Sequence, residues 1–434
     1  METKEQVGIK EIEKEFESVI GYKFVKKELV RICDVLCNQE YYNNLGVSVP
    51  SGLCLSGVPG VGKTLMAECF IKASKRKAFI CRKDLKDVEF IGYIKQTFKN
   101  AQENAPSIVF LDDMDKFCNN DEQHKNSDVF ITIQSCIDQV KGCGVFVLAT
   151  INDRRTIPSS LLREGRFDSG IVVKPPRGED IEQIVEHYIK KKKYKIEFDT
   201  KIVARILNEK SCAVLETVIN EAGINAGFKR KDKIEMDDII SACLRVIYRS
   251  PEMKNIYSPE ELKSIAYHEA GHVVISEVLE PGSVNLVSVR SNYGNVGGFV
   301  NYYSEDNFVN KQGLENRVIV LLGGKASTEI CFGEVDVGVM LDLRNAFEII
   351  DDFVDNYCSF GFDKNVFYAY NSTENKERRD LQKSLEMQRY YQMAKKILID
   401  NREFLDKLAQ ALMVKDVLTS TEIQEIKASC KIVA

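Results

Sequence analysis

One eight-residue stretch constrains the fold of this chain more than any other feature. The segment "GVPGVGKT" at 57–64 fits G-x-x-x-x-G-K-[ST], follows the apolar run "GLCLSG", and precedes the helical pattern "TLMAECFIKAS". In such a loop, backbone N–H groups at a helix N-terminus surround phosphate oxygens, a lysine reaches the outer phosphates, and a threonine hydroxyl holds Mg²⁺. The segment predicts a nucleotide-binding unit of a parallel α/β sheet. The residues expected at the nucleotide are Gly57, Val58, Pro59, Gly60, Val61, Gly62, Lys63 and Thr64.

Apolar patterning divides the chain into three blocks. In the first block, short β-rich runs alternate with helical patterns, and the second is charged and helical. The third block follows the proline-containing "SPEMKNIYSPEE" (250–261) and is helical apart from a hairpin-like insert at 283–303, with its turn around Asn292 to Gly298. We predict domains at 1–178, 179–252 and 253–434. The expected strands are 52–57, 77–82, 107–113 and 144–150, with 170–176 as an edge strand.

Composition excludes several classes of protein. The 434 residues carry a net charge of −5, which argues against nucleic-acid binding because phosphate-binding surfaces need a basic excess. The 13 cysteines include no C-x-x-C pair, which indicates reduced thiols and a cytoplasmic chain rather than a disulfide framework. The charged N-terminus is not a signal peptide, and we expect no segment to span a bilayer.

Nucleotide hydrolysis needs polar groups in addition to the phosphate loop, and such side chains lie at or just after the ends of the predicted strands at 107–113 and 144–150. Asp112 and Asp113 end the apolar run "IVFL", where the first carboxylate can hold the Mg²⁺ shell and the second can orient the attacking water. Asn152 in "ATIND" can contact the γ-phosphate or that water. In "LLREGRFD", Arg163 and Arg166 can stabilise the charge of phosphoryl transfer, although surface ion pairs fit them equally well.

A second motif lies in "YHEAGHVVISEV", which places His268 and His272 four residues apart with Glu269 between them. The preceding "SPEE" (258–261) predicts a capping box and a helix start, so both histidines project from one helix face. That spacing lets two imidazoles bind one Zn²⁺. Glu269 can take a proton from water that the zinc polarises and pass it to the leaving amine. The alternative is two histidines that neighbouring groups satisfy on a polar helix.

A catalytic zinc needs a third protein ligand and one open position. No histidine or paired cysteine follows His272, so we expect a carboxylate. Asp342 opens an amphipathic helical pattern, but from spacing alone it could equally be the N-cap. The candidates are Glu329, Glu334, Asp336 and Asp342.

These motifs together carry a family resemblance. The order "GVPGVGKT", "VFLDDMD", "ATIND" and "LLREGRFD" resembles the AAA+ ATPase module. Downstream, "SIAYHEAGH", "LLGGKASTEICFG" and "GVMLDLRNA" resemble FtsH-type ATP-dependent zinc proteases, and the likeness runs from about residue 15 to about residue 360. It implies an α/β AAA+ P-loop domain with a small helical lid, followed by a mostly α-helical zinc metallopeptidase domain. It also implies that Asp342 is the third zinc ligand.

The resemblance further implies an assembly and a substrate path. In this family the arginines act across a subunit boundary, which implies a homo-hexameric ring. In "EFIG" (89–92), Phe90 would grip a substrate polypeptide in the pore, whereas the bare sequence favours a core position for it. The stretch "NVGGFVNYY" would be an edge strand that pairs with an extended substrate backbone.

The chain also departs from the family pattern. Asp113 stands where the family has Glu, which shortens the reach of the carboxylate and bears on the hydrolysis rate rather than on nucleotide binding. The segment after "EFIG" is shorter, and "SCAVLETVINEA" (211–222) lacks the usual Gly-rich turn. Typical members carry N-terminal transmembrane helices. We expect this chain to be a naturally soluble relative rather than one whose anchor has been removed.

The sequence thus predicts an ATP-dependent zinc metalloprotease that unfolds, translocates and cleaves protein substrates, with Zn²⁺, ATP and Mg²⁺ as cofactors. One alternative is a gated peptidase with a weak motor. The other is a chaperone-like AAA+ ring whose peptidase site is vestigial.

Overall fold

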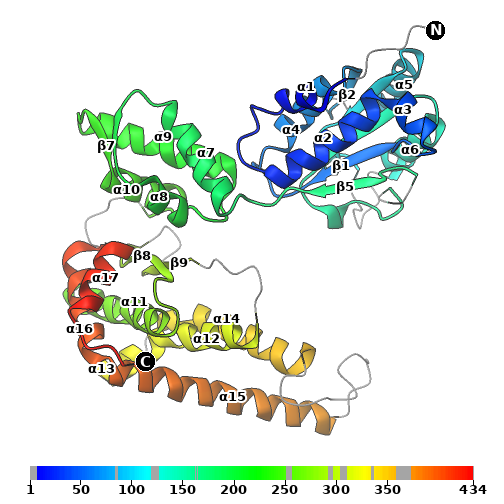
Figure 1. The fold of residues 1–434 in the computed structure, drawn as a ribbon. Helices are drawn as coiled ribbons and strands as arrows, with labels where there is room; N and C mark the ends of the chain where they lie inside the picture. The colour runs from blue at the N-terminus through cyan, green and yellow to red at the C-terminus, as the bar shows by residue number, and fades with distance from the viewer. Residues whose placement is uncertain are drawn as a thin grey trace. The chain divides into compact units, whose positions relative to one another are not determined.

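The computed structural model contains two compact units (Figure 1). The first comprises Met1–Ile196 and Leu207–Ile224, and the second comprises Glu197–Ile206 and Asn225–Ala434. The structure describes residues 7–83, 87–118, 127–161, 163, 165–250, 257–291, 297–303, 310–333, 337–357 and 373–433.

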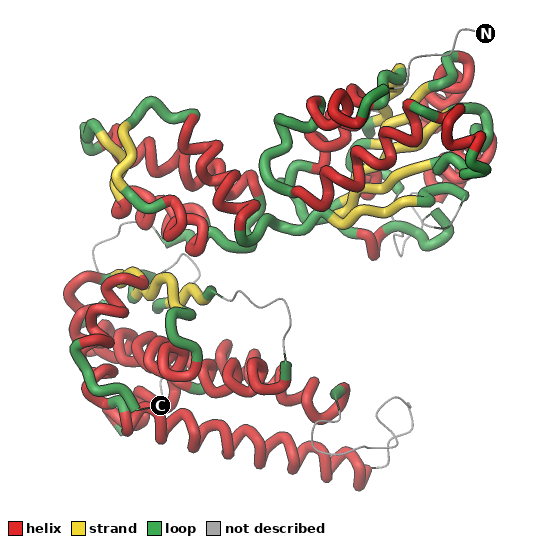
Figure 2. The backbone as a smooth tube through the Cα atoms, in the orientation of Figure 1, coloured by secondary structure: helices red, strands yellow, loops and turns green. Residues whose placement is uncertain are grey.

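The first unit is built on a five-stranded parallel sheet in the order β2-β3-β4-β1-β5. Figure 2 draws the strands in yellow. The inner strands β1, β3 and β4 are buried along their whole length, which is why they read as continuous apolar runs. The outer strands β2 and β5 include exposed residues. The strands span Gly52–Ser56 (β1), Lys77–Cys81 (β2), Ser107–Leu111 (β3), Val145–Ile151 (β4) and Ser169–Val172 (β5), and all five predicted strands are confirmed.

The first unit also contains helices, and one of them corrects an expectation. Phe90 on α5 is fully buried, and its ring lies 5.1 Å from the ring of Phe117. The core position that the bare sequence favoured is confirmed, and a role for Phe90 in gripping substrate does not fit a side chain without exposed surface. The helices are α1 (Ile9–Lys14), α2 (Lys23–Cys37), α3 (Gln39–Asn44), α4 (Lys63–Ala73), α5 (Asp87–Glu103), α6 (Ser127–Gln139) and α7 (Glu179–Lys190), with 3-10 turns η1 (Met114–Lys116) and η2 (Arg154–Thr156).

The second unit is organised around α11 (Pro259–Leu279). Its N-terminus carries the predicted capping box between Ser258 and Glu261, with Pro259 in the first turn. Residues 251–256 of the predicted domain boundary lie outside the described residues. The other elements are α8 (Thr200–Ile206), β7 (Lys233–Glu235), α10 (Met236–Val246), α12 (Lys311–Leu321), α13 (Gly323–Phe332), η3 (Val337–Val339), α14 (Met340–Asp351), η4 (Asp352–Asn356), α15 (Thr373–Asp400), α16 (Arg402–Lys415) and α17 (Ser420–Ala428); β6 (Lys195–Glu197) and α9 (Cys212–Phe228) have residues in both units.

A small antiparallel sheet lies beside α11. Strand β8 (Val284–Ser288) pairs with β9 (Phe299–Tyr302), which confirms the hairpin-like insert, although turn residues 292–296 are outside the described residues. A third strand, β10 (Val417–Thr419), pairs with the other side of β8 and was not predicted. Strand β9 therefore forms one edge of this sheet.

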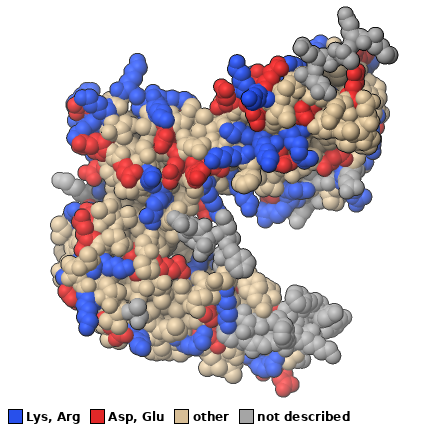
Figure 3. Space-filling view, viewed as in Figure 1, with Lys and Arg blue, Asp and Glu red and all other residues tan. Residues whose placement is uncertain are grey.

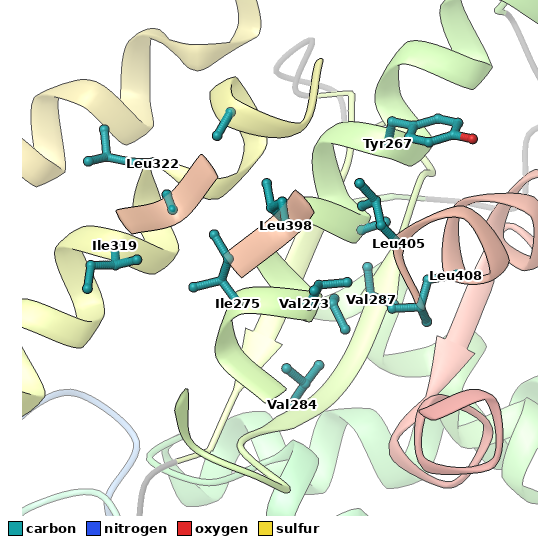
Figure 4. Close-up of a cluster of buried hydrophobic side chains, with 14 of the residues drawn as sticks. Tyr267, Val273, Ile275, Val284, Val287, Ile319, Leu322, Leu398, Leu405 and Leu408 are labelled. Atoms are coloured by element: carbon teal, nitrogen blue, oxygen red, sulfur yellow. The ribbon is translucent and has the colours of Figure 1, made fainter. Parts of the chain in front are cut away.

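Helix α11 is the centre of the largest described core of the second unit. Its apolar residues pack with those of α12, α15, α16 and β8 (Figure 4). Near its C-terminus, Glu277 is fully buried but fully paired, because Lys427 lies 3.1 Å and Gln424 2.8 Å from its carboxylate. Burying an unpaired charge is costly, so this pair fixes α17 against α11.

The two faces of β9 have different neighbours. Phe299 stacks on Tyr248, which follows α10, with ring centroids 3.8 Å apart and planes 13° from parallel. The Asn301 amide also donates to the Tyr248 hydroxyl at 2.5 Å. Immediately before β9, a Cβ atom at Gly298 would lie 2.6 Å from Oε1 of Glu269. The start of β9 therefore packs directly on the glutamate of the H-E-x-x-H motif.

The surface is mixed in charge. Lysines and arginines lie among aspartates and glutamates over the face shown in Figure 3. Among the residues that the structure describes, no helix has the length and apolar character needed to cross a membrane.

Candidate metal centre and nucleotide site

Three side chains converge beside α11. Nε2 of His268 and Nε2 of His272 lie 3.3 and 3.2 Å from the same oxygen, Oδ2 of Asp342, and 3.1 Å from each other. Asp342 lies in the first turn of α14, whose N-cap is Val339, so the N-cap alternative for Asp342 is wrong. The structure therefore joins two motifs that are 70 residues apart in the sequence.

Of the other predicted carboxylates, the structure describes Glu329, which does not take this position. Glu329 on α13 accepts a hydrogen bond from Lys395 at 2.6 Å and also contacts Tyr391 and Lys325. The hydrogen bonds from Lys395 and Tyr391 outweigh burial and lower its pKa to about 2. Glu334 and Asp336 lie outside the described residues.

The donor set fits Zn²⁺. Ligand atoms about 2 Å from a tetrahedral ion are about 3.3 Å apart, which matches the three separations between the imidazoles and the carboxylate. His272 Nδ1–H donates to the Val320 carbonyl at 2.7 Å, which leaves Nε2 free to act as a ligand. For His268, the ring nitrogen Nδ1 has no hydrogen-bond partner among the described residues.

Burial and charge set the protonation of this group. Burial acts to lower the pKa of His272, but Asp342 outweighs it and raises that pKa to about 9. Burial acts to raise the pKa of Asp342, but hydrogen bonds from both imidazoles hold it well below its usual range. The group thus attracts positive charge, which a divalent cation supplies once the imidazoles lose their protons.

Glu269 is the fourth member of this site. Its carboxyl is buried, and burial raises its pKa, an effect that the neighbouring imidazoles only partly offset. A raised pKa brings a carboxyl closer to the pH at which it can both accept and return a proton.

Glycines bring the backbone of α13 against the histidines. A Cβ atom at Gly271 would lie 2.5 Å from the Gly323 carbonyl, and one at Gly323 would lie 2.8 Å from the Gly271 carbonyl. A Cβ atom at Gly324 would lie 2.4 Å from Cε1 of His268. Side chains at these positions would force α11 and α13 apart, so the "AGH" and "LLGG" sequences form one packing unit.

The predicted phosphate loop lies between β1 and α4, after a strand and before a helix. Gly60 and Gly62 have φ of 80° and 95°, a region that favours glycine. Lys63 Nζ donates to the carbonyls of Gly57 and Val58 at 2.7 and 3.1 Å.

The acids that follow β3 meet polar groups from other strands. Lys63 Nζ also donates to Asn152 Oδ1 at 2.9 Å, and the Thr64 hydroxyl lies 3.3 Å from Asp112 Oδ1. The structure therefore brings together the loop, the first acid and Asn152. Asp113 has a φ of 50° and its carboxylate is paired with Lys116 at 2.6 Å.

Sequence reasoning missed three residues here. Asp115, the third acid of "DDMD", accepts the Asn152 backbone N–H and side-chain amide, each at 3.1 Å. The Thr150 hydroxyl donates to Asp112 Oδ1 at 2.8 Å, and Arg82 pairs with Asp112 Oδ2 at 2.7 Å. The repeated acid in "DDMD" could have signalled Asp115, whereas no spacing signals the other two.

The two predicted arginines differ in environment. Arg166 is mostly buried and forms a two-pronged ion pair with Asp138 on α6, with both distances 2.8 Å. It also donates to the Ser160 carbonyl at 2.5 Å. Arg163 is exposed. Within one chain, the ion-pair alternative therefore describes Arg166.

Two family models match this chain, one in each half. The family model of the ATPase family associated with various cellular activities (AAA) matches residues 53–175, and that of Peptidase family M41 matches residues 255–426. ATP-dependent zinc metalloprotease FtsH 2 of Thermoanaerobacter sp. is 30% identical over 437 residues, covering 98% of this chain and 85% of that protein. The chain belongs to the FtsH family.

Other FtsH proteins match over similar lengths. The FtsH of Pelobacter propionicus is 30% identical over 95% of this chain and 71% of its own, and that of Thermotoga maritima is 29% identical over 95% and 72%. Family membership makes this chain an ATP-dependent zinc metalloprotease with Zn²⁺, ATP and Mg²⁺ as cofactors. Its FtsH fold consists of a parallel AAA sheet and a mostly helical M41 region.

The glycine contact at the metal centre leads to a testable prediction. We expect Gly324→Ala to weaken zinc binding by about 10- to 100-fold, because the added methyl group displaces the His268 ring. Competition with a chromogenic chelator measures the affinity. Gly313→Ala on α12 is the matched control, since its Cβ atom would be 3.5 Å from the nearest atom, an ordinary contact. Equal affinity in the two variants would contradict the prediction.

Proposed function

We propose that His268, His272 and Asp342 are the zinc ligands of this FtsH-family enzyme and that Glu269 is its general base. Zinc in such a site polarises a water molecule and the substrate carbonyl. Glu269 takes a proton at its carboxylate and returns it to the leaving amine. The convergence of both Nε2 atoms on Asp342 Oδ2, next to a buried carboxyl with a raised pKa, carries this proposal.

The substrate of this reaction is a protein chain. We propose that its extended backbone pairs along β9, whose outer edge has no neighbouring strand within the described sheet. The contact between Gly298 and Glu269 supports this, because a peptide added at that edge would pass beside the base.

We propose that residues 57–64 bind the phosphates of ATP and that Thr64 and Asp112 hold Mg²⁺, which screens phosphate charge. The Thr64 hydroxyl oxygen and the Asp112 carboxylate oxygen lie 3.3 Å apart, and oxygen atoms of this kind are the ligands that Mg²⁺ prefers. Asp113 would orient the attacking water, and Asn152 would contact the γ-phosphate or that water.

The domain limits and the assembly also remain proposals. We place the nucleotide-binding domain at 1–178, the lid at 179–252 and the peptidase at 253–434. We propose a homo-hexamer in which Arg163 and Arg166 act on the nucleotide of a neighbouring subunit, and the exposure of Arg163 supports such a role. A cytoplasmic location is supported by the twelve described cysteines, all of which are free thiols.

Glu269→Gln tests the peptidase assignment. We expect casein cleavage to fall by at least about a hundredfold, because the amide cannot accept the proton. Zinc content and ATP hydrolysis should stay unchanged, since the amide is the same size and the nucleotide site is elsewhere in the chain. Cleavage at the wild-type rate would remove Glu269 from the mechanism, and a wild-type protein without bound zinc or cleavage would support the chaperone-like alternative.

Asp113→Glu tests the weak-motor alternative, which the ion pair between Asp113 and Lys116 favours. If the short carboxylate limits hydrolysis, the longer one should raise ATP turnover by roughly three- to tenfold, with little change in nucleotide affinity. Steady-state phosphate release measures turnover, and fluorescent ADP measures affinity. Turnover that stays level or falls would show that the aspartate is not the limiting group.

Mixing two inactive variants tests the ring. We expect Arg163→Ala and Asp113→Asn each to lose most ATP hydrolysis, because one lacks the arginine and the other the acid. Mixed rings should recover part of the ATP hydrolysis, because Arg163 of one subunit can face Asp113 of its neighbour across some of the subunit boundaries. Sedimentation should give six times 49.3 kDa. A smaller mass, or a mixture no more active than its components, would argue against shared sites.

A further inference from the structure

The acid proposed to hold Mg²⁺ carries an ion pair that neither motif predicts. Arg82 follows β2, the strand next to β3 in the sheet. Its Nε and Nη2 atoms lie 2.8 and 2.7 Å from Oδ2 of Asp112. The Asp112 side chain is 8% exposed and that of Arg82 is 50% exposed, so the guanidinium covers the carboxylate from the solvent side.

The other oxygen of this carboxylate is also engaged. Oδ1 of Asp112 accepts the Thr150 hydroxyl at 2.8 Å and lies 3.3 Å from the Thr64 hydroxyl. A carboxylate has about four acceptor positions on two oxygens. Two N–H groups and two hydroxyls therefore use its acceptor capacity. A Mg²⁺ ion, or a water molecule of its shell, needs one of the same positions.

Charge adds to this competition. Mg²⁺ and a guanidinium repel each other, and Asp112 is the one acid that Arg82 touches among the contacts of the described residues. Asp113 and Asp115 are held separately, by Lys116 and by Asn152. Asp112 is therefore the carboxylate for which Arg82 and the metal ion compete.

We propose that Arg82 competes with Mg²⁺ for the Asp112 carboxylate and thereby sets the metal concentration at which the nucleotide site fills. Metal binding displaces the guanidinium from Oδ2, and loss of metal restores the ion pair. Arg82 is thus a positioning residue that acts through Asp112. This inference rests on the proposed nucleotide site.

The test measures metal binding directly. Mn²⁺ is titrated into protein saturated with ADP, and free Mn²⁺ is followed by electron paramagnetic resonance for wild type and Arg82→Ala. We expect the variant to bind Mn²⁺ roughly three- to tenfold more tightly, the size expected when a half-exposed arginine no longer competes. Arg82→Lys keeps the positive charge but not the two-pronged contact. Its affinity for Mn²⁺ should therefore lie between that of wild type and that of Arg82→Ala.

A matched control and a separate measurement keep the outcomes distinct. Arg31→Ala removes an exposed arginine that pairs with Glu28 on α2, and it should leave Mn²⁺ affinity at the wild-type value. Mn²⁺ affinity in Arg82→Ala that equals or falls below wild type would overturn the competition. Binding of fluorescent ADP in EDTA tests the nucleotide site itself. Wild-type protein that binds no ADP would refute that site, whereas ADP binding with unchanged Mn²⁺ affinity would refute only the role of Arg82.

Discussion

The close approach of α11 and α13 is the contact on which the peptidase unit depends. Gly271 and Gly323 each face the backbone of the opposite helix, and Gly324 faces the imidazole of His268. Because no side chain intervenes, the backbone of α13 limits where the His268 ring can lie. Val320, in the last turn of α12, accepts a hydrogen bond from Nδ1–H of His272 and so fixes that ring. The H-E-x-x-H spacing supplies two imidazoles on one helix face, but contacts with α12 and α13 decide their orientation.

The two sites treat their carboxylates in different ways. At the metal centre, Asp342 faces two imidazoles, and the arrangement favours a cation between them. At the nucleotide site, each acid of "DDMD" already has a partner from the protein: Arg82, Lys116 or Asn152. The first arrangement concentrates negative charge for a permanent metal ion. The second balances that charge within the chain, which suits a site where Mg²⁺ arrives and leaves with the nucleotide.

Features formed by residues close together in the sequence could be predicted from it. Contacts between residues far apart in the sequence could not. The five strands, the phosphate loop and the capped histidine helix follow from short patterns, because each depends on neighbours within a few residues. The third ligand remained open among four carboxylates until the family resemblance favoured Asp342. Arg82 and Thr150 were missed because they reach Asp112 across strands, and β10 was missed because three residues carry almost no pattern. The pore role of Phe90 came from the family alone, and burial against Phe117 contradicts it.

Strand β9 has two kinds of neighbour, the aromatic ring of Tyr248 and the carboxyl of Glu269. Phe299 of β9 is stacked on Tyr248, which follows α10, and Gly298, just before β9, lies against Glu269. Ile240 and Leu244 of α10 pack with Leu286 of β8, so helix and hairpin share one small apolar core. A tilt of α10 would therefore move the hairpin with it and alter the distance between β9 and the Glu269 carboxyl. The position of β9 over Glu269 is in this way tied to the orientation of a helix that carries none of the predicted site residues.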